Sequence, residues 1–173
     1  TFMNIMSNVI IDCDTFDAVD VRPHESQNRT MKGDLFFNGS SETPEEVGMC
    51  AYLDAEVQDL YLNSFCFGFR AFHDAPVNRL FLAYYFRSEQ GRDLLKSLAQ
   101  GATRYNLSKK ALLRVKFPLP RIEEQAALAS IFSDMDAELA ALELKLTKAR
   151  QLKQGMMQVL LTGQIRLPLD AAA

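Results

Sequence analysis

The sequence contains few residues of the kinds that catalyse reactions or bind metals. Among its 173 residues are only two histidines, His24 and His73, and three cysteines. No glycine-rich loop of the GxxxxGK(S/T) or GxGxxG type occurs, so no motif supports nucleotide binding. The Asn/Asp-Pro-Pro-aromatic motif of adenine methylation is missing as well. Because no Ser-His-Asp or Cys-His set can be recognised, we expect no catalytic residues and no metal site, and we interpret both histidines as ordinary surface or core residues.

Long apolar runs and cysteine pairs are also missing. Cys13, Cys50 and Cys66 are odd in number and lack CxxC spacing, which argues against a disulfide framework and against a zinc ribbon. No apolar run approaches the roughly 18 to 20 residues that a membrane helix needs, and no signal peptide opens the sequence. We therefore expect reduced, partly buried thiols in a soluble, cytoplasmic protein without a membrane partner.

Charge is distributed unevenly along the chain. The net charge is −3, but residues 1–59 hold 12 acidic and three basic side chains, whereas residues 60–121 hold three acidic and 11 basic ones. The basic residues of the second segment alternate with aromatic residues such as Phe69, Tyr84 and Tyr105. Two interpretations stay open: a solvated surface balanced by the acidic first third, or a face that binds phosphate groups.

The first 70 residues are typical of short strands separated by turns. We predict strands at residues 9–12, 35–37, 49–53 and 63–70 from their apolar and aromatic content. The intervening segment 38–46 is rich in Gly, Ser, Glu and Pro, and it predicts an exposed loop. This part of the chain is therefore expected to be β-rich.

Helical spacing begins after this segment. Asp74 is a suitable N-cap, and apolar residues then recur every three or four positions. We expect Gly91 to interrupt the helix, residues 93–99 to resume it, and Gly101 to end it. Residues 103–108 then predict a polar turn.

From residue 122 to residue 162 there is no proline and a single glycine, Gly155, which predicts one long helix. At 1.5 Å per residue it would be about 60 Å long. Its apolar residues recur at steps of three and four, a heptad-like seam that predicts pairing with another helix. The seam consists of Leu128, Phe132, Met135, Leu139, Leu142, Leu146, Ala149, Leu152, Met156 and Val159. Residues 122–143 carry only acidic charges and 144–162 only basic ones, so an antiparallel partner of the same sequence would place acid opposite base.

The fold class expected from these patterns is α+β, with a β-rich domain that contains short helices, followed by a long C-terminal helix able to form a coiled coil. We expect the domain at residues 1–120, the helix at 121–163 and a tail at 164–173. The last three alanines, 171–173, are typical of residues added by cloning.

Several short motifs resemble one family. They are GDLFFNGSSET at 33–43, NSFCFGFR at 63–70, GATRYNLS at 101–108, PLP at 118–120 followed by Glu124-Gln125, and LKQGMMQVLLTG at 152–163. Together they are similar to the specificity (S) subunits of type I restriction-modification enzymes. Full-length members have two target-recognition domains and two antiparallel helices, so the resemblance implies that this chain holds one of each. It also implies that one or more strands normally precede Thr1, and that the chain is a half-subunit or a fragment of a full subunit.

The resemblance implies a DNA-binding protein that is not itself an enzyme. A modification subunit would methylate adenine with S-adenosylmethionine, and a restriction subunit would use ATP and Mg, so this chain would need no cofactor of its own. Its partners would be double-stranded DNA, both subunits and a second long helix. The alternatives are a coiled-coil interaction module whose head binds a protein, and, less favoured, an independent enzyme.

Candidate DNA-binding residues follow from side-chain chemistry within this resemblance. For reading base edges we select the polar residues Asn38, Ser40, Ser41, Thr43, Arg104, Tyr105 and Asn106. For contacting phosphates we select the basic residues Arg29, Lys32, Arg70, Lys109 and Lys110. An alternative interpretation is that Asn38-Gly39 and Asn106 are only turn residues.

Overall fold

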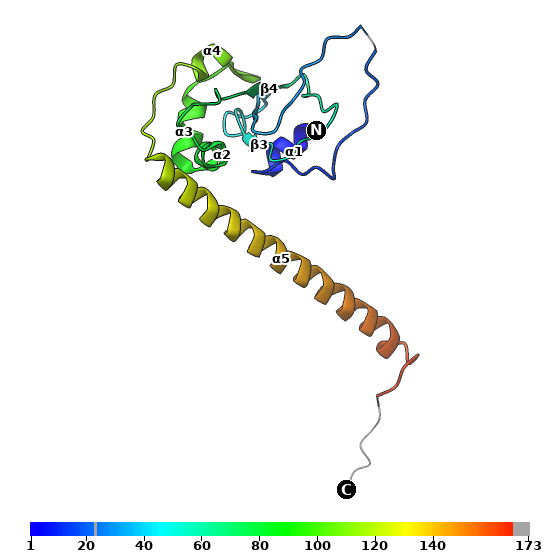
Figure 1. Ribbon diagram of the computed structural model, residues 1–173. Coiled ribbons are helices and arrows are strands. Elements are labelled where there is room, and N and C mark those ends of the chain that lie inside the picture. Colours follow the sequence, from blue (N-terminus) through cyan, green and yellow to red (C-terminus); the bar gives the residue numbers. More distant parts are fainter. Residues whose placement is uncertain (23, 168–173) are drawn as a thin grey trace. The chain divides into compact units, whose positions relative to one another are not determined.

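The computed structural model describes residues 1–22 and 24–167, and it divides the chain into two units. Residues 1–129 form the first unit, which we call the head, and residues 130–173 form the second, the helix unit. The terminal alanines and part of the expected tail, residues 168–173, lie outside the described residues. The elements shown in Figure 1 are α1 (Phe2–Ser7), β1 (Leu35–Asn38), β2 (Ser40–Ser41), β3 (Cys50–Tyr52), β4 (Cys66–Phe69), α2 (Arg79–Arg87), α3 (Glu89–Ser97), β5 (Ala99–Gln100), β6 (Tyr105–Leu107), α4 (Lys109–Leu112) and α5 (Ile122–Leu161).

The first sheet has three antiparallel strands in the order β3-β1-β4. Its central strand β1 is buried on both faces, which explains why Leu35-Phe36-Phe37 is a continuous apolar run rather than an alternating one. Leu35 and Phe37 join the larger core cluster, together with residues of α2 and α3, whereas Phe36 joins a smaller cluster with Ile5 of α1. The sheet is thus packed between α1 on one side and α2 with α3 on the other.

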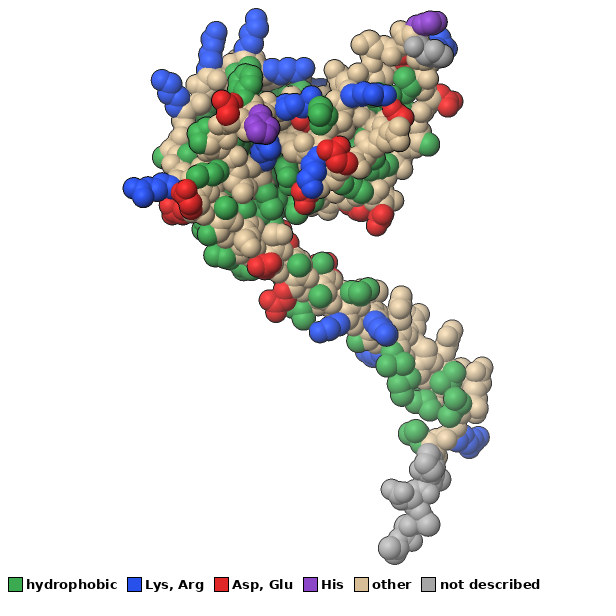
Figure 2. Space-filling model, viewed as in Figure 1, with side chains coloured by type: hydrophobic (Ala, Val, Ile, Leu, Met, Phe, Trp, Pro, Cys, Tyr) green, Lys and Arg blue, Asp and Glu red, His purple; other side chains and the backbone are tan. Residues whose placement is uncertain are grey.

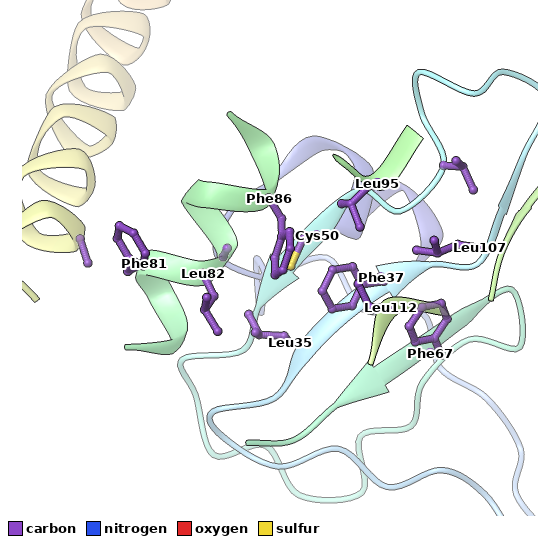
Figure 3. Close-up of a cluster of buried hydrophobic side chains, with 13 residues drawn as sticks. Leu35, Phe37, Cys50, Phe67, Phe81, Leu82, Phe86, Leu95, Leu107 and Leu112 are labelled. Carbon is purple, nitrogen blue, oxygen red and sulfur yellow. The ribbon is translucent and has the colours of Figure 1, made fainter. Parts of the chain in front are cut away.

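Aromatic rings form the centre of the larger cluster. The ring of Phe37 stacks on Phe67 with centroids 5.6 Å apart and meets Phe86 edge-on at 5.4 Å. Figure 3 shows Phe67 of β4 close to Leu112 of α4, with Leu107 of β6 nearby. These side chains pack β6 and α4 against the first sheet.

The second sheet has the order β2-β6-β5, and two of its strands, β2 and β6, lie in segments that we expected to be loops. The third, β5, begins at Ala99, which we expected to be the last residue of a helix. Ser40-Ser41 pairs with Asn106 and Tyr105, so the predictions of an exposed loop at 38–46 and of a polar turn at 103–108 are wrong at these positions. Strands this short and polar carry no periodicity of their own. They form because two distant segments supply each other's backbone hydrogen bonds.

The helical region differs from the prediction in its boundaries. Asn78, not Asp74, caps α2, and its side chain accepts a hydrogen bond from Phe81 N at 2.9 Å. The break between α2 and α3 lies at Ser88, while Gly91 is inside α3. Gly101 does not end a helix; with φ of 135° it lies after β5. Capping side chains at 78 and 88 therefore set the helix starts.

The N-terminal segment also differs from the prediction. Residues 2–7 form α1, and of the expected strand at 9–12 only Ile10 forms a bridge, with Tyr52. Arg87 holds this segment, because its guanidinium donates to the carbonyl oxygens of Ile5 at 2.6 Å and Asn8 at 2.7 Å. A cation at the carbonyl end of a helix is favourable.

Helix α5 is continuous over 40 residues, which confirms the predicted long helix, and the α+β class is confirmed as well. Its first two turns belong to the head by their contacts. There the Gln125 side chain accepts from Asn78 N at 2.8 Å and donates to Pro120 O at 2.9 Å. In the part of the chain that the structure describes, no helix combines the length and apolar character needed to cross a membrane.

Candidate nucleic-acid interface

Gly39 joins the two sheets of the head. Its N–H donates to the carbonyl oxygen of Phe65 at 2.8 Å, and its own carbonyl accepts from Leu107 N at 2.9 Å. A Cβ at this position would lie 3.1 Å from Phe65 O, so glycine permits the close approach. Gly39 thus brings the turn before β4 and strand β6 together, although Phe65 and Leu107 are 42 positions apart in the sequence.

A groove lies between these two segments, and we call it the β4–β6 groove. Its volume is about 460 Å³. Phe67 and Leu107, both buried, contribute apolar lining, while Arg104, Asn106 and Lys109 contribute polar groups. Among the described residues, no acidic side chain lines it. The remaining lining residues are Gly39, Ser40, Ser64, Phe65 and Cys66.

Basic side chains gather at the edge of the head over α4 (Figure 2). The Nζ of Lys109 lies 5.6 Å from the centroid of the Phe67 ring, a cation–π contact that positions the ammonium group at the groove. Within residues 1–22 and 24–167, no carboxylate lies within ion-pair distance of Arg104, Lys109 or Lys110. These three cations are exposed, and they are therefore available to an anionic ligand.

A second groove of about 360 Å³ adjoins the first and shares Cys66, Phe67 and Lys109 with it. Arg29 and Arg70 line it. Burial raises the pKa of the Cys66 thiol to about 11, so at neutral pH this side chain is an uncharged part of the wall of both grooves.

The other three cations selected for phosphate contact, Arg29, Lys32 and Arg70, have carboxylate partners. Arg29 pairs with Asp59 at 2.5 Å and Lys32 with Asp54 at 3.4 Å. Arg70 makes two bonds to the buried Asp34, 2.6 Å from Nε to Oδ1 and 2.7 Å from Nη2 to Oδ2. The hydrogen bond to Asp34 also raises the pKa of the Arg70 guanidinium. Arg70 is thus held by a buried carboxylate, whereas the ion pairs of Arg29 and Lys32 lie on the surface of the head.

Two of the residues selected for base reading lie in the interior. Asn38 has an exposed fraction of 0%, and its Oδ1 accepts from Met49 N at 2.6 Å. Ser41 is buried, and its hydroxyl donates to Glu46 Oε2 at 2.8 Å. Both are corrections to the expectation of an exposed polar loop, because the segment is drawn into the two sheets and its polar groups organise the backbone around it.

The other selected residues occupy different positions. Asn106 and Arg104 are exposed at the β4–β6 groove, and Thr43 is exposed outside it. Ser40 lines the groove, but its Oγ is buried and has no hydrogen-bond partner among the described residues. Tyr105 is partly buried against the core. The structure therefore brings together Arg104, Asn106 and Lys109, together with the backbone at Ser40.

Sequence reasoning did not select Phe65, a groove residue that is 56% exposed. The signal was present: Asn63 two positions earlier starts a turn, and its Oδ1 accepts from Phe65 N at 2.8 Å. An aromatic residue fixed in a turn does not follow strand alternation, so its exposure cannot be inferred from periodicity.

Several basic residues of the segment 60–121 serve the fold instead of a ligand. Besides Arg87 at the end of α1, Arg92 donates to the carbonyl oxygens of Glu45 at 2.8 Å and Val47 at 2.5 Å. Burial lowers the pKa of its guanidinium. Lys96 forms an ion pair of 2.5 Å with Glu45. The charge asymmetry of the sequence therefore overstates the basic surface of the head.

The predicted helix-pairing seam is largely exposed along α5. Leu139 is 57% exposed, and Phe132, Met135, Leu142, Leu146, Leu152 and Met156 are exposed as well. Val159 is half-buried. Leu128 is a correction, because it packs against the core of the head. Figure 2 shows hydrophobic side chains along this helix.

The fold and the groove define a class: a small α+β domain with a cationic, aromatic-lined groove, continued by a long helix whose apolar seam is exposed. The sequence model of the Type I restriction modification DNA specificity domain matches residues 20–151. The chain belongs to this family, and the resemblance inferred from the motifs is confirmed.

Two relatives come from Methanocaldococcus jannaschii. The type I restriction enzyme MjaVIII specificity subunit is 30% identical over 96 residues, which cover 56% of this chain and 23% of the relative. The putative type I restriction enzyme MjaX specificity subunit is 25% identical over 135 residues, covering 78% of this chain and 31% of the relative. The chain thus spans about a quarter to a third of the length of these relatives. Both are named as specificity subunits, which agrees with the expectation that the chain is not an enzyme.

Proposed function

We propose that this chain recognises a specific sequence in double-stranded DNA as part of a type I specificity subunit, and that it thereby directs adenine methylation and restriction by partner subunits. The observation that carries the proposal is the β4–β6 groove, where two exposed cations, Arg104 and Lys109, have no carboxylate partner among the described residues and stand beside an exposed amide, Asn106.

The chemistry of this groove suits duplex DNA. Exposed lysine and arginine contact phosphates without reading sequence, whereas an amide or a guanidinium can make paired hydrogen bonds to one base edge in the major groove. Arg104 directly precedes β6, and Asn106 is the middle residue of this strand. Both line the β4–β6 groove, so a single approach of the duplex can engage both. Membership of the DNA specificity family supports this assignment.

In this proposal, the reactions take place elsewhere. S-adenosylmethionine, ATP and Mg belong to the modification and restriction subunits, the complex works in the cytoplasm, and this chain contributes the choice of site.

The test is methylation by the assembled complex. The chain is co-expressed with its modification subunit, and methylated adenines are mapped across the host genome. Asn106→Ala, or Arg104→Ala, is expected to relax the preference at one position of the half-site roughly 5- to 150-fold, which corresponds to the 1 to 3 kcal/mol of one paired contact. The control variant Lys110→Ala should lower methylation at all sites in proportion. A uniform decrease for the first two variants would remove them from base reading.

The long helix supports a second part of the proposal, an antiparallel pair formed with the helix of another chain or domain. We expect the isolated chain to self-associate, because the exposed seam would otherwise remain in water, and apolar burial contributes about 25 cal/mol per Å². Light scattering at micromolar concentration should show a dimer for the wild type and a monomer for Leu139→Glu with Leu142→Glu. The control Gln151→Glu with Gln154→Glu adds the same charge outside the seam and should remain dimeric. A wild-type monomer would refute this pairing.

A further inference from the structure

Phe65 is an aromatic residue that the surrounding backbone keeps at the surface. Three hydrogen bonds fix its position: its N–H donates to Asn63 Oδ1 at 2.8 Å, Cys66 N donates to Asn63 O at 3.0 Å, and its carbonyl accepts from Gly39 N at 2.8 Å. The residue is nevertheless 56% exposed. Its exposure is therefore a property of an ordered turn and not of a frayed end.

Asn106 lines the same groove as Phe65. It lies on β6, the central strand of the second sheet, and its backbone is paired with Ser40 on one side and Gln100 on the other. Its side chain is exposed, and Nδ2 makes one long hydrogen bond of 3.3 Å, to Arg104 O. An ordered strand thus presents an amide whose second N–H and carbonyl oxygen are available in the structure.

An amide and an apolar ring in one cationic groove match a particular base pair. In the major groove, adenine offers an N7 acceptor and an N6 donor, which an asparagine amide can bind together, and its partner thymine offers a 5-methyl group. A G·C pair has no methyl group and replaces it with a C–H beside the amino group of cytosine. The polar and apolar parts of the groove are therefore complementary to an A·T pair.

We propose that the β4–β6 groove selects an A·T pair in the recognised sequence, with the Asn106 amide on adenine and the Phe65 ring against the 5-methyl group of the paired or neighbouring thymine. This inference rests on the proposed function, since it needs the head to bind duplex DNA. It assigns a specificity-determining role to Phe65, and it makes uracil, which differs from thymine only by that methyl group, the discriminating probe.

The experiment uses the full chain and two libraries of duplexes with a randomised eight-base-pair core, one containing thymine and the other uracil. Bound and unbound fractions are sequenced for the wild type, Phe65→Ala and the control Phe72→Ala, which truncates an 84% exposed phenylalanine outside the groove. For the wild type we expect an A·T preference at one position that is about fourfold weaker in the uracil library, the factor for burying one methyl-sized group. Phe65→Ala should remove this difference between the libraries, and Phe72→Ala should retain it.

The outcomes separate this inference from the proposed function. Sequence-selective binding with identical preferences in both libraries, or a difference that persists in Phe65→Ala, overturns the role of Phe65 but leaves DNA recognition intact. Binding without any base preference also overturns it. If no duplex of either library binds at 50 mM salt, both the inference and the proposed function fail. Equal melting temperatures of the three proteins serve to show that a lost preference does not reflect an unfolded head.

Discussion

Replacing Lys109 and Lys110 together by glutamate is expected to weaken binding of the chain to every duplex by about 30-fold or more at 0.15 M salt. The slope of log affinity for B-DNA against log salt concentration is about −0.9 for each neutralised phosphate. Relative to 1 M salt, each contact therefore contributes a factor of about five to the affinity at 0.15 M. Both lysines are exposed, and neither has a carboxylate partner among the described residues. The slope of log affinity against log salt should also become shallower by about 2.

A matched variant tests whether the location of the charge matters. Lys145→Glu with Lys148→Glu makes the same change of charge on α5, outside the head. Fluorescence anisotropy with one labelled duplex at several salt concentrations should show nearly wild-type affinity for this variant. Equal losses from both pairs would mean that net charge, not the face of the head over α4, governs binding. Binding insensitive to salt would favour the alternative of a protein-binding head.

The charge pattern of the sequence predicted where exposed cations gather better than it predicted the partner of each cation. Residues 60–121 do supply Arg104, Lys109 and Lys110 to one edge of the head, as the charge asymmetry suggested. The sequence could not show that Arg70 forms an ion pair with the buried Asp34, because the two residues are 36 positions apart. Charge counts register the sign of a side chain but not the partner that the fold gives it.

The same limit applies to the polar residues. Asn38 and Asn106 stand in similar turn-like sequences, each next to an apolar residue. Asn38 is nevertheless fully buried, whereas Asn106 is exposed. The difference arises at Gly39, where the chain leaves the first sheet and enters the second. No local pattern encodes this exchange of partners. In contrast, α5 could be predicted almost to its last residue, because a long run without proline and with steps of three and four depends only on nearby residues.

Gly91 shows how tightly the head depends on one small residue. In α3, an added Cβ at this position would lie 1.9 Å from Tyr85 O and 2.7 Å from the Cα of Phe86, both backbone atoms of α2. An alanine at position 91 would therefore force the backbones of α2 and α3 apart. This would disturb Phe86, which packs beside Phe37 in the aromatic core. We therefore expect Gly91→Ala to destabilise the head by about 3 kcal/mol, the upper end of the usual cost of overpacking.

The measurement is thermal unfolding followed by near-ultraviolet circular dichroism, which reports the packed aromatic side chains of the head, whereas the far-ultraviolet signal also contains α5. For a unit of this size, 3 kcal/mol corresponds to a decrease of about 10 °C or more in melting temperature. Gly155→Ala is the matched control, since a Cβ there would have no atom within 4 Å. In a helix interior, alanine is more favourable than glycine by about 1 kcal/mol. It should leave the head transition unchanged. Coincident transitions for the two variants would contradict the close packing of α2 on α3, and with it the order of the core that supports the β4–β6 groove.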